Sequence, residues 1–236
     1  MPPFENSSRY YRNPNIIDLR KDKTVSLSQI MGLLSFMFLA MAAGAFLVPQ
    51  SLYVPAMILE FVLLFAIPVM NRRAVQQGAD PAAGLTGGLA LLFAACAGAV
   101  LAPIVQPLAA NPEGIAILGE AALVTFIVFA GFGAYGLMTR RNLSVMYKAL
   151  MIGILVLLGI MILSMFFTFF GSFSVLIGLG GAVLFSLMTA LDFQQAKYST
   201  ADNAVMVTLS IFLDFVNLFV FILDLFMIFG GGGRRR

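Results

Sequence analysis

The sequence predicts an all-α membrane protein in which seven helices cross the bilayer. Of the 236 residues, 61% are hydrophobic and 11% are charged, whereas a soluble domain carries about 45–50% apolar and about 25% charged residues. The 14 basic and 11 acidic side chains could not cover the surface of a soluble globule of this size. The apolar residues also gather in runs of about 20, which is the length that a helix needs to cross the hydrocarbon core.

The first three spans are separated by turn residues and charges. No charge lies between Lys23 and Glu60, and this gap holds the first span, which ends at a turn marked by Pro49. The second span contains Glu60, and the third begins at a glycine pair, Gly84 and Gly88, of the kind that packs helices closely. We expect these spans at about 27–48, 54–70 and 84–105.

The other four spans are bounded in the same way. The fourth ends before a pair of arginines, the fifth begins after Lys148, and the sixth contains a cluster of three glycines that we interpret as a packing site. We expect these spans at about 114–138, 149–170, 172 to at least 191, and 204–229. The chain then divides into a polar tail (1–26), a transmembrane domain (27–229) and a Gly/Arg tail (230–236).

Basic residues fall on alternate connections, which predicts the orientation of the chain. Because loops rich in Lys and Arg stay in the cytoplasm, we expect a cytoplasmic N-terminus. Arg234–Arg236 break the pattern if the last span crosses fully and obey it if that span is re-entrant. We expect a full crossing, since about 26 apolar residues are ample. The 11 residues that follow the pattern are Arg9, Arg12, Arg20, Lys21, Lys23, Arg72, Arg73, Arg140, Arg141, Lys148 and Lys197.

Missing residue types exclude several kinds of site. The chain has no His and one Cys, so it can form no Ser-His-Asp triad, HExxH zinc site, internal disulfide or CxxC motif. Cys96 lies in an apolar run and is interpreted as a small buried hydrophobic residue. We expect no cofactor, no nucleic-acid partner and no enzymatic activity.

Acidic residues within the spans are the candidates for function, because an acid at mid-bilayer costs about 2.5–3.5 kcal/mol even on the mildest scale. Asp214 lies about 15 Å along the last span at 1.5 Å per residue. Asn217 and Asp224 share its helix face, so this helix should be surrounded by the others, with its polar stripe facing a cavity. Asp192 lies near the end of the sixth span, where it is either functional or simply the polar end of a helix. Glu60, about six residues into the second span, could be a second polar contact.

Two buried acids close together can act as a proton switch without histidine, because both cannot ionise cheaply. When ionised, they can also bind a hard cation through oxygen. The alternative for Asp214 is a plain hydrogen bond to a neighbouring helix. Arg72 and Arg73 are most simply positive-inside anchors, although one of them could reach an acid at the cytoplasmic mouth.

Three segments resemble the Bax inhibitor-1 (transmembrane Bax-inhibitor-motif) family. They are AYGLMTRRNLS at 134–144, TALDFQQAK at 189–197 and LSIFLDFVNLF at 209–219. The order of these segments and the plan of seven spans agree with the family. The sequence departs from the family pattern at Phe193, Ala196 and Asp224.

The resemblance implies six helices around a central seventh and a pH-sensitive calcium leak. It places the family's pair of hydrogen-bonded aspartates at Asp192 and Asp214, which would bind Ca²⁺ transiently, and a basic latch at Arg72 or Arg73. The two aspartates can meet only if the sixth helix continues to about Lys197 and the seventh starts close to the cytoplasmic surface.

We therefore expect a multi-pass protein of a bacterial inner membrane that conducts a cation, Ca²⁺, under the control of protons. The lipid bilayer, Ca²⁺ and protons are its expected partners, together with other membrane proteins. The alternative is a non-conducting membrane regulator that binds a membrane protease or stress or cell-death factors. An intramembrane aspartyl protease would also need paired acids, but the sequence lacks the expected YD and GxGD motifs.

Overall fold

The computed structural model describes residues 27–81, 84–166 and 173–231. Within these ranges the chain forms seven α-helices and two short 3-10 helices. Each α-helix, in some cases together with an adjoining 3-10 turn, is long and apolar enough to cross a membrane, which confirms the predicted fold class. In chain order the elements are α1 (Leu27–Leu47), η2 (Gln50–Leu52), α2 (Tyr53–Gln76), α3 (Leu85–Ala109), α4 (Pro112–Met138), η3 (Leu143–Met146), α5 (Tyr147–Phe166), α6 (Ser174–Lys197) and α7 (Ala204–Gly231).

Two helices run beyond the apolar segments that predicted them. The second continues past residue 70 to Gln76, so that Arg73 lies in its last turn, where a positive charge interacts favourably with the helix dipole. The sixth continues to Lys197, which also lies in its last turn. Residues 167–172, on which the expected end of span five and start of span six fall, lie outside the described residues.

The last helix, α7, is unbroken over 28 residues. At 1.5 Å per residue it is about 42 Å long, which exceeds the hydrocarbon core of about 30 Å. This length and continuity agree with the expected full crossing. The helix includes Gly230 and Gly231, and Arg234–Arg236 lie outside the described residues.

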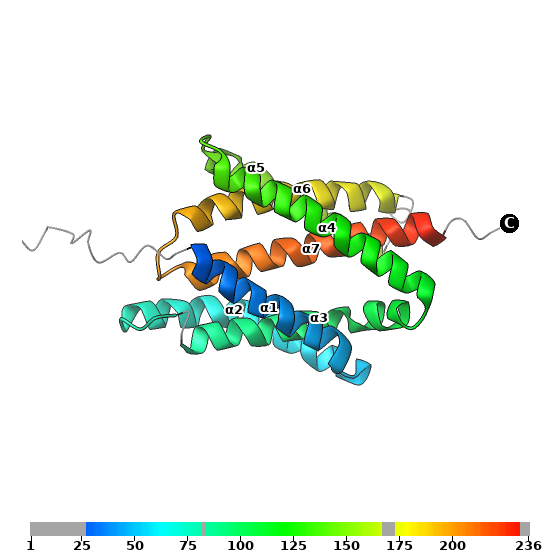
Figure 1. The fold of residues 1–236 in the computed structure, drawn as a ribbon, viewed down its shortest axis with the longest axis horizontal. Helices are drawn as coiled ribbons and strands as arrows, with labels where there is room; N and C mark the ends of the chain where they lie inside the picture. Colours follow the sequence, from blue (N-terminus) through cyan, green and yellow to red (C-terminus); the bar gives the residue numbers. More distant parts are fainter. Residues whose placement is uncertain (1–26, 82–83, 167–172, 232–236) are drawn as a thin grey trace, which may run out of the picture.

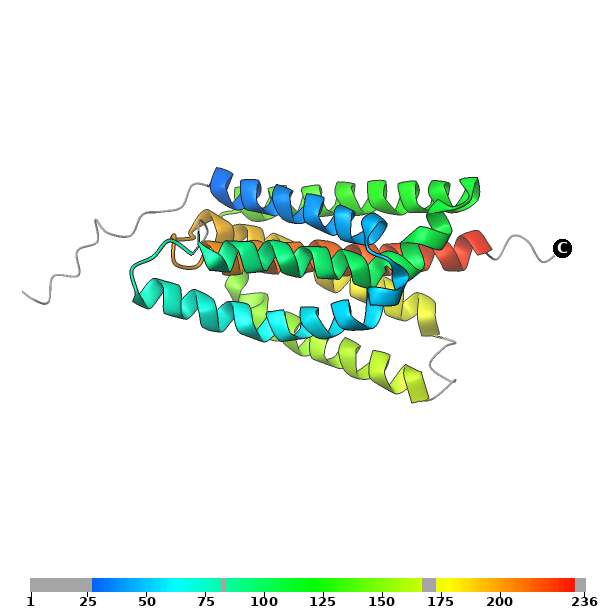
Figure 2. The same cartoon turned by 90° about the horizontal axis from the view of Figure 1, so that it is seen from below.

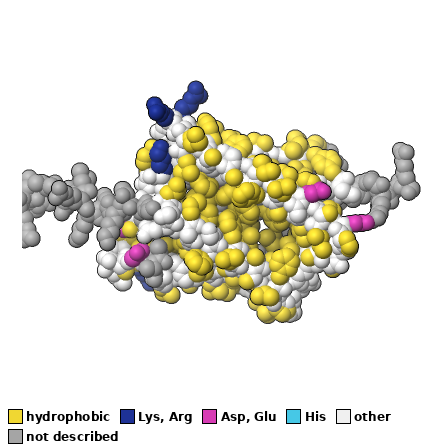
Figure 3. Space-filling view, in the orientation of Figure 1, with side chains coloured by type: hydrophobic (Ala, Val, Ile, Leu, Met, Phe, Trp, Pro, Cys, Tyr) yellow, Lys and Arg dark blue, Asp and Glu magenta, His cyan; other side chains and the backbone are white. Residues whose placement is uncertain are grey.

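The helices run roughly along one common direction, so their ends gather at two opposite ends of the bundle (Figures 1 and 2). The six described basic residues all lie where α2, α4 and α6 end or where α5 begins, and we call this the basic end. Figure 3 shows the Lys and Arg side chains of one face gathered there. The alternation seen in the sequence therefore corresponds to one end of the folded molecule. These six residues are Arg72, Arg73, Arg140, Arg141, Lys148 and Lys197.

Helices α1 and α3 pack closely through two glycines. A Cβ atom added to Gly44 would overlap the backbone carbonyl oxygen of Ala95, and one added to Gly98 would overlap that of Met41. Glycine at both positions lets the two backbones touch, as small residues do in membrane bundles. Farther along this interface, Gln106 Nε2 donates to the carbonyl oxygens of Ala45 (3.0 Å) and Val48 (3.1 Å), which satisfies backbone groups at the end of α1.

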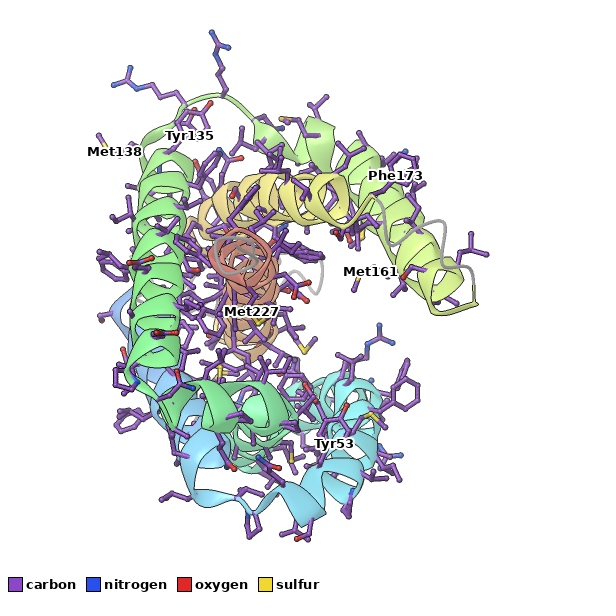
Figure 4. The ribbon with its side chains drawn as sticks, turned by 90° about the vertical axis from the view of Figure 1, so that its right-hand side faces the viewer. Tyr53, Tyr135, Met138, Met161, Phe173 and Met227 are labelled. Carbon is purple, nitrogen blue, oxygen red and sulfur yellow. The ribbon has the colours of Figure 1, made fainter. Side chains whose placement is uncertain are left out.

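Figure 4 shows the other helices arranged as an open arc about α7, with α2, marked by Tyr53, and α5, marked by Met161, at the two ends of the arc. Helix α7 packs against α6, α4, α1, α3 and α2. A larger share of α3 than of α7 is nevertheless buried, 56% against 39% over the 18 residues compared in each. The expected arrangement of six helices around a central seventh is therefore not established by this packing.

The glycines that the sequence marked as packing sites behave differently from one another. In α6, Gly178 and Gly181 receive the side chains of Leu225 and Phe221 from α7, while Gly180 faces open space. Gly88 in α3 also has no atom within 4 Å of an added Cβ. The cluster in α6 is thus a packing site at two of its three positions, and Gly88 packs against nothing within the described residues.

Candidate functional site

Asp192 of α6 and Asp214 of α7 meet inside the bundle. Their side chains lie in hydrogen-bond contact, and each is only 4% exposed. A carboxylate has no donor, so two carboxyl groups can hydrogen-bond to each other only when one of them carries a proton. The structure thus brings together the two acids that the sequence singled out.

The path of the chain between the two helices explains how the acids meet. Asp192 lies five residues before the end of α6, and Asp214 lies ten residues after the start of α7. Helix α6 continues to Lys197, as the contact requires, and α7 begins at Ala204, at the basic end. The connection is ordered by backbone bonds from Tyr198 and Ser199 to the last turn of α6.

The pair is enclosed, and one of its atoms has no partner. Asp214 Oδ2 is buried and makes no hydrogen bond within the described structure, and an unsatisfied buried polar atom costs about 1–3 kcal/mol. The described residues contain no group of three or more His, Cys, Asp or Glu side chains that could hold a metal. Two carboxyl groups alone supply fewer oxygen atoms than the 6–8 ligands that Ca²⁺ takes.

Phe193 of α6, Phe129 of α4 and Phe215 of α7 form an aromatic cluster. Phe193 follows Asp192 in the chain and points toward α4, where a Cβ added to Gly133 would press on its ring. The same ring meets Phe129 edge-on at 5.4 Å, and Phe129 meets Phe215 at 5.1 Å. Glycine on α4 therefore makes room for the phenylalanine that departs from the family pattern.

The two candidate latch residues do not touch the acids. Arg72 and Arg73 are exposed at the end of α2, and among the residues that the structure describes neither forms an ion pair. Asn71, the residue before them, points inward instead. Its Nδ2 donates to the backbone carbonyl oxygen of Asp202 at 2.8 Å, which ties α2 to the connection between α6 and α7. The latch stays a prediction.

The secondary polar residues lie apart from the pair. Asn217 is half-buried and its Nδ2 donates to the carbonyl oxygen of Leu213 in its own helix, at 2.8 Å. Asp224 is exposed near the far end of α7, and Glu60 is half-buried near Cys96, which is a free buried cysteine as expected. No contact between Glu60 and Asp224 occurs in the part of the chain that is described.

Two side chains that organise the basic end were not identified from the sequence. Asn71 is one of them. The only sequence signal for it is its position directly before the arginine pair at the end of α2. Gln194 is the other, because its Oε1 accepts from the backbone N–H of Leu143 and its Nε2 donates to the carbonyl oxygen of Arg141, both at 2.8 Å. This side chain fixes the connection between α4 and α5 to α6, two residues after Asp192.

Replacing Gln194 by alanine is expected to lower the free energy of unfolding by about 1–3 kcal/mol, because the N–H of the buried Leu143 would lose its acceptor. Thermal unfolding of the purified protein in detergent measures this. The control is Gln195→Ala, which removes an exposed neighbour of the same type. Equal melting temperatures for the two variants would contradict the role given to Gln194.

Comparisons with known proteins identify the family. The family model described as "Inhibitor of apoptosis-promoting Bax1" matches residues 24–231. The chain is 27% identical over 220 residues to uncharacterized protein Cj0236c of Campylobacter jejuni, covering 92% of this chain and 94% of that one. It is 32% identical over 181 residues to uncharacterized protein YrjE of Lactococcus lactis, covering 73% and 75%.

A third relative is named as a membrane protein. It is uncharacterized membrane protein SpyM3_0260 of Streptococcus pyogenes, which is 30% identical over 185 residues and for which 74% of each chain is covered. The seven apolar helices agree with the family match, which spans the whole described bundle. The chain is a multi-pass integral membrane protein and belongs to the Bax inhibitor-1 family.

Proposed function

We propose that the protein is a pH-sensitive cation leak channel, for Ca²⁺, gated by the Asp192–Asp214 pair. The observation that carries the proposal is the contact of two enclosed carboxyl groups within an apolar bundle. Such a pair changes its net charge when it gains or loses a proton, and it does so without a histidine, which the chain lacks.

The gating scheme follows from the charge on the pair. At acidic pH the pair shares a proton, and Arg72 and Arg73 stay in water. At higher pH the pair loses this proton, and two adjacent carboxylates in a low-dielectric site repel each other. An arginine at the end of α2 then pairs with Asp192, which draws α2 inward and closes the mouth at the basic end. In this scheme the described arrangement corresponds to the protonated state.

The permeant ion and the orientation follow from the same charges. Carboxylate oxygen suits hard cations such as Ca²⁺, and the pair would bind the ion only in passing, so the scheme includes no resident cofactor and no catalytic step. The basic end faces the cytoplasm by the positive-inside rule, which places the N-terminus there too. Similarity to relatives from Campylobacter, Lactococcus and Streptococcus supports a bacterial inner membrane.

Reconstitution in liposomes tests the proposal. Vesicles that contain the purified full chain and a trapped Ca²⁺ indicator should take up Ca²⁺ faster at mildly acidic than at mildly alkaline pH, because the pair holds its proton only in the first case. Protein-free vesicles measure the background leak. Uptake no faster than this background at every pH would overturn the proposal.

The family description supports a second candidate function. A protein that matches a family described as an inhibitor of apoptosis-promoting Bax1 could regulate another membrane protein without conducting ions. Close-packed helices with small-residue contacts such as Gly44 and Gly98 suit this role. Specific co-purification of a membrane protein from native membranes, combined with no flux in liposomes, would favour it.

A further inference from the structure

A polar pocket at the basic end has no role in the proposed gating. Its volume is about 610 Å³, and every residue that lines it has a polar side chain, none of them acidic. The lining comes from the connection between α4 and α5, including Arg140, Arg141 and Ser144, and from the end of α6 and the start of α7, including Gln195, Tyr198 and Asn203.

We propose that this pocket binds the phosphate headgroup of an anionic phospholipid in the leaflet at the basic end. Its two adjacent arginines are exposed, and within the described ranges no acidic side chain pairs with either of them. The planar guanidinium of arginine donates two parallel hydrogen bonds to a phosphate. Two unpaired guanidinium groups beside neutral donors therefore suit a phosphodiester.

The backbone that carries the arginines is held in place. Gln194 fixes the backbone on both sides of Asn142, and Asn142 Oδ1 accepts from both the backbone N–H of Ser144 (3.0 Å) and its hydroxyl (2.6 Å). Across the pocket, Asn203 Oδ1 accepts from the N–H of Thr200 at 2.9 Å, which leaves its amide N–H groups to donate. The pocket is thus pre-formed, so binding would order little of the chain.

An apolar hollow beside the same connection favours a lipid over a soluble anion. It encloses about 150 Å³ and is lined by residues such as Tyr135, Leu143, Met146 and Leu191. Tyr135, labelled in Figure 4, lines the hollow, and Thr139, which follows the end of α4, lines the polar pocket. The two residues are four positions apart, so the hollow lies about one helical turn deeper in the bundle than the polar pocket. A phospholipid offers both parts, a charged headgroup and an acyl chain that begins one turn below it.

Native mass spectrometry of the purified full chain tests the proposal. The protein is titrated with phosphatidylglycerol and, in parallel, with phosphatidylcholine of the same acyl chains. We expect R140Q/R141Q to weaken phosphatidylglycerol binding at least about tenfold, the effect of losing one charge-assisted hydrogen bond or more. The matched control is R72Q/R73Q, which removes an equal charge from the same end and should retain wild-type binding. R140K/R141K should give an intermediate affinity, because it keeps the charge and loses the bidentate geometry.

Each other outcome would contradict the proposal in a distinct way. Equal losses in R140Q/R141Q and R72Q/R73Q would mean that only net charge attracts the lipid. Displacement of phosphatidylglycerol by inorganic phosphate at similar concentration would mean a site for a free anion. If R140Q/R141Q does not elute as folded protein, a wild-type affinity in the folded R140K/R141K variant would overturn the bidentate site. None of these outcomes depends on whether the protein conducts Ca²⁺.

Discussion

Replacing Asp214 by asparagine is expected to abolish the pH response of Ca²⁺ uptake in liposomes. Asparagine has nearly the same shape and keeps a donor for Asp192, but it cannot ionise. The proton switch of the pair is then lost, and the ratio of uptake at mildly acidic pH to uptake at mildly alkaline pH should fall to about one. Asp192→Asn should have the same effect, because the switch belongs to the pair and not to either residue.

The matched control is Asp202→Asn, since Asp202 lies just before α7 and its side chain is exposed. This variant should keep the wild-type ratio. The gating proposal fails if Asp214→Asn and Asp192→Asn both leave the uptake and its pH dependence as they are in the wild type. Size-exclusion chromatography of each variant before reconstitution separates lost gating from lost folding.

Replacing Gly98 by alanine is expected to destabilise the bundle strongly. The added Cβ would overlap the carbonyl oxygen of Met41 in α1, and a backbone atom cannot move aside as the tip of a side chain can. Overpacking of this kind lowers the free energy of unfolding by about 1–3 kcal/mol or more. Unfolding in mixed detergent micelles with increasing SDS measures the loss.

Gly88→Ala is the control, because Gly88 lies in the same helix and no atom would contact its added Cβ. Its stability should equal that of the wild type or exceed it by up to about 1 kcal/mol, because alanine favours a helix more than glycine does. Gly44→Ala should lose a similar amount of stability to Gly98→Ala, because its added Cβ would overlap the carbonyl oxygen of Ala95 across the same interface. If Gly98→Ala is as stable as Gly88→Ala, α1 and α3 do not touch through their backbones.

The helices could be predicted because apolar runs of membrane length leave the chain few alternatives. Asp214 could be singled out for the same reason, since an acid deep in an apolar span needs a partner. Its contact with Asp192 could not be predicted on that ground alone, because the contact also requires the helix containing Asp192 to continue past the apolar run to Lys197. The family resemblance supplied that pairing, and spacing along the chain did not.

Contacts with distant backbone atoms could not be predicted from the residues alone. Asn71 bonds to the carbonyl oxygen of Asp202, 131 positions away, and Gln194 bonds to backbone groups 51 and 53 positions away. Backbone donors and acceptors carry no sequence signature, so nothing in the sequence shows that these side chains link distant segments. Gly98 and Gly88 likewise look the same in the sequence, and only the neighbour that each one faces distinguishes them.

In the proposed gating, the proton held by Asp192 and Asp214 controls the passage of Ca²⁺. Infrared difference spectroscopy of the reconstituted protein tests it most directly, by following the carbonyl stretch of protonated carboxyl groups during a pH titration. The band assigned to the pair is the one present in the wild type and absent from Asp214→Asn. We predict that this band and the Ca²⁺ uptake of the same vesicles decline together, with one midpoint, as the pH rises. Uptake that changes with pH while the band stays constant would mean that the pair does not control the passage of Ca²⁺.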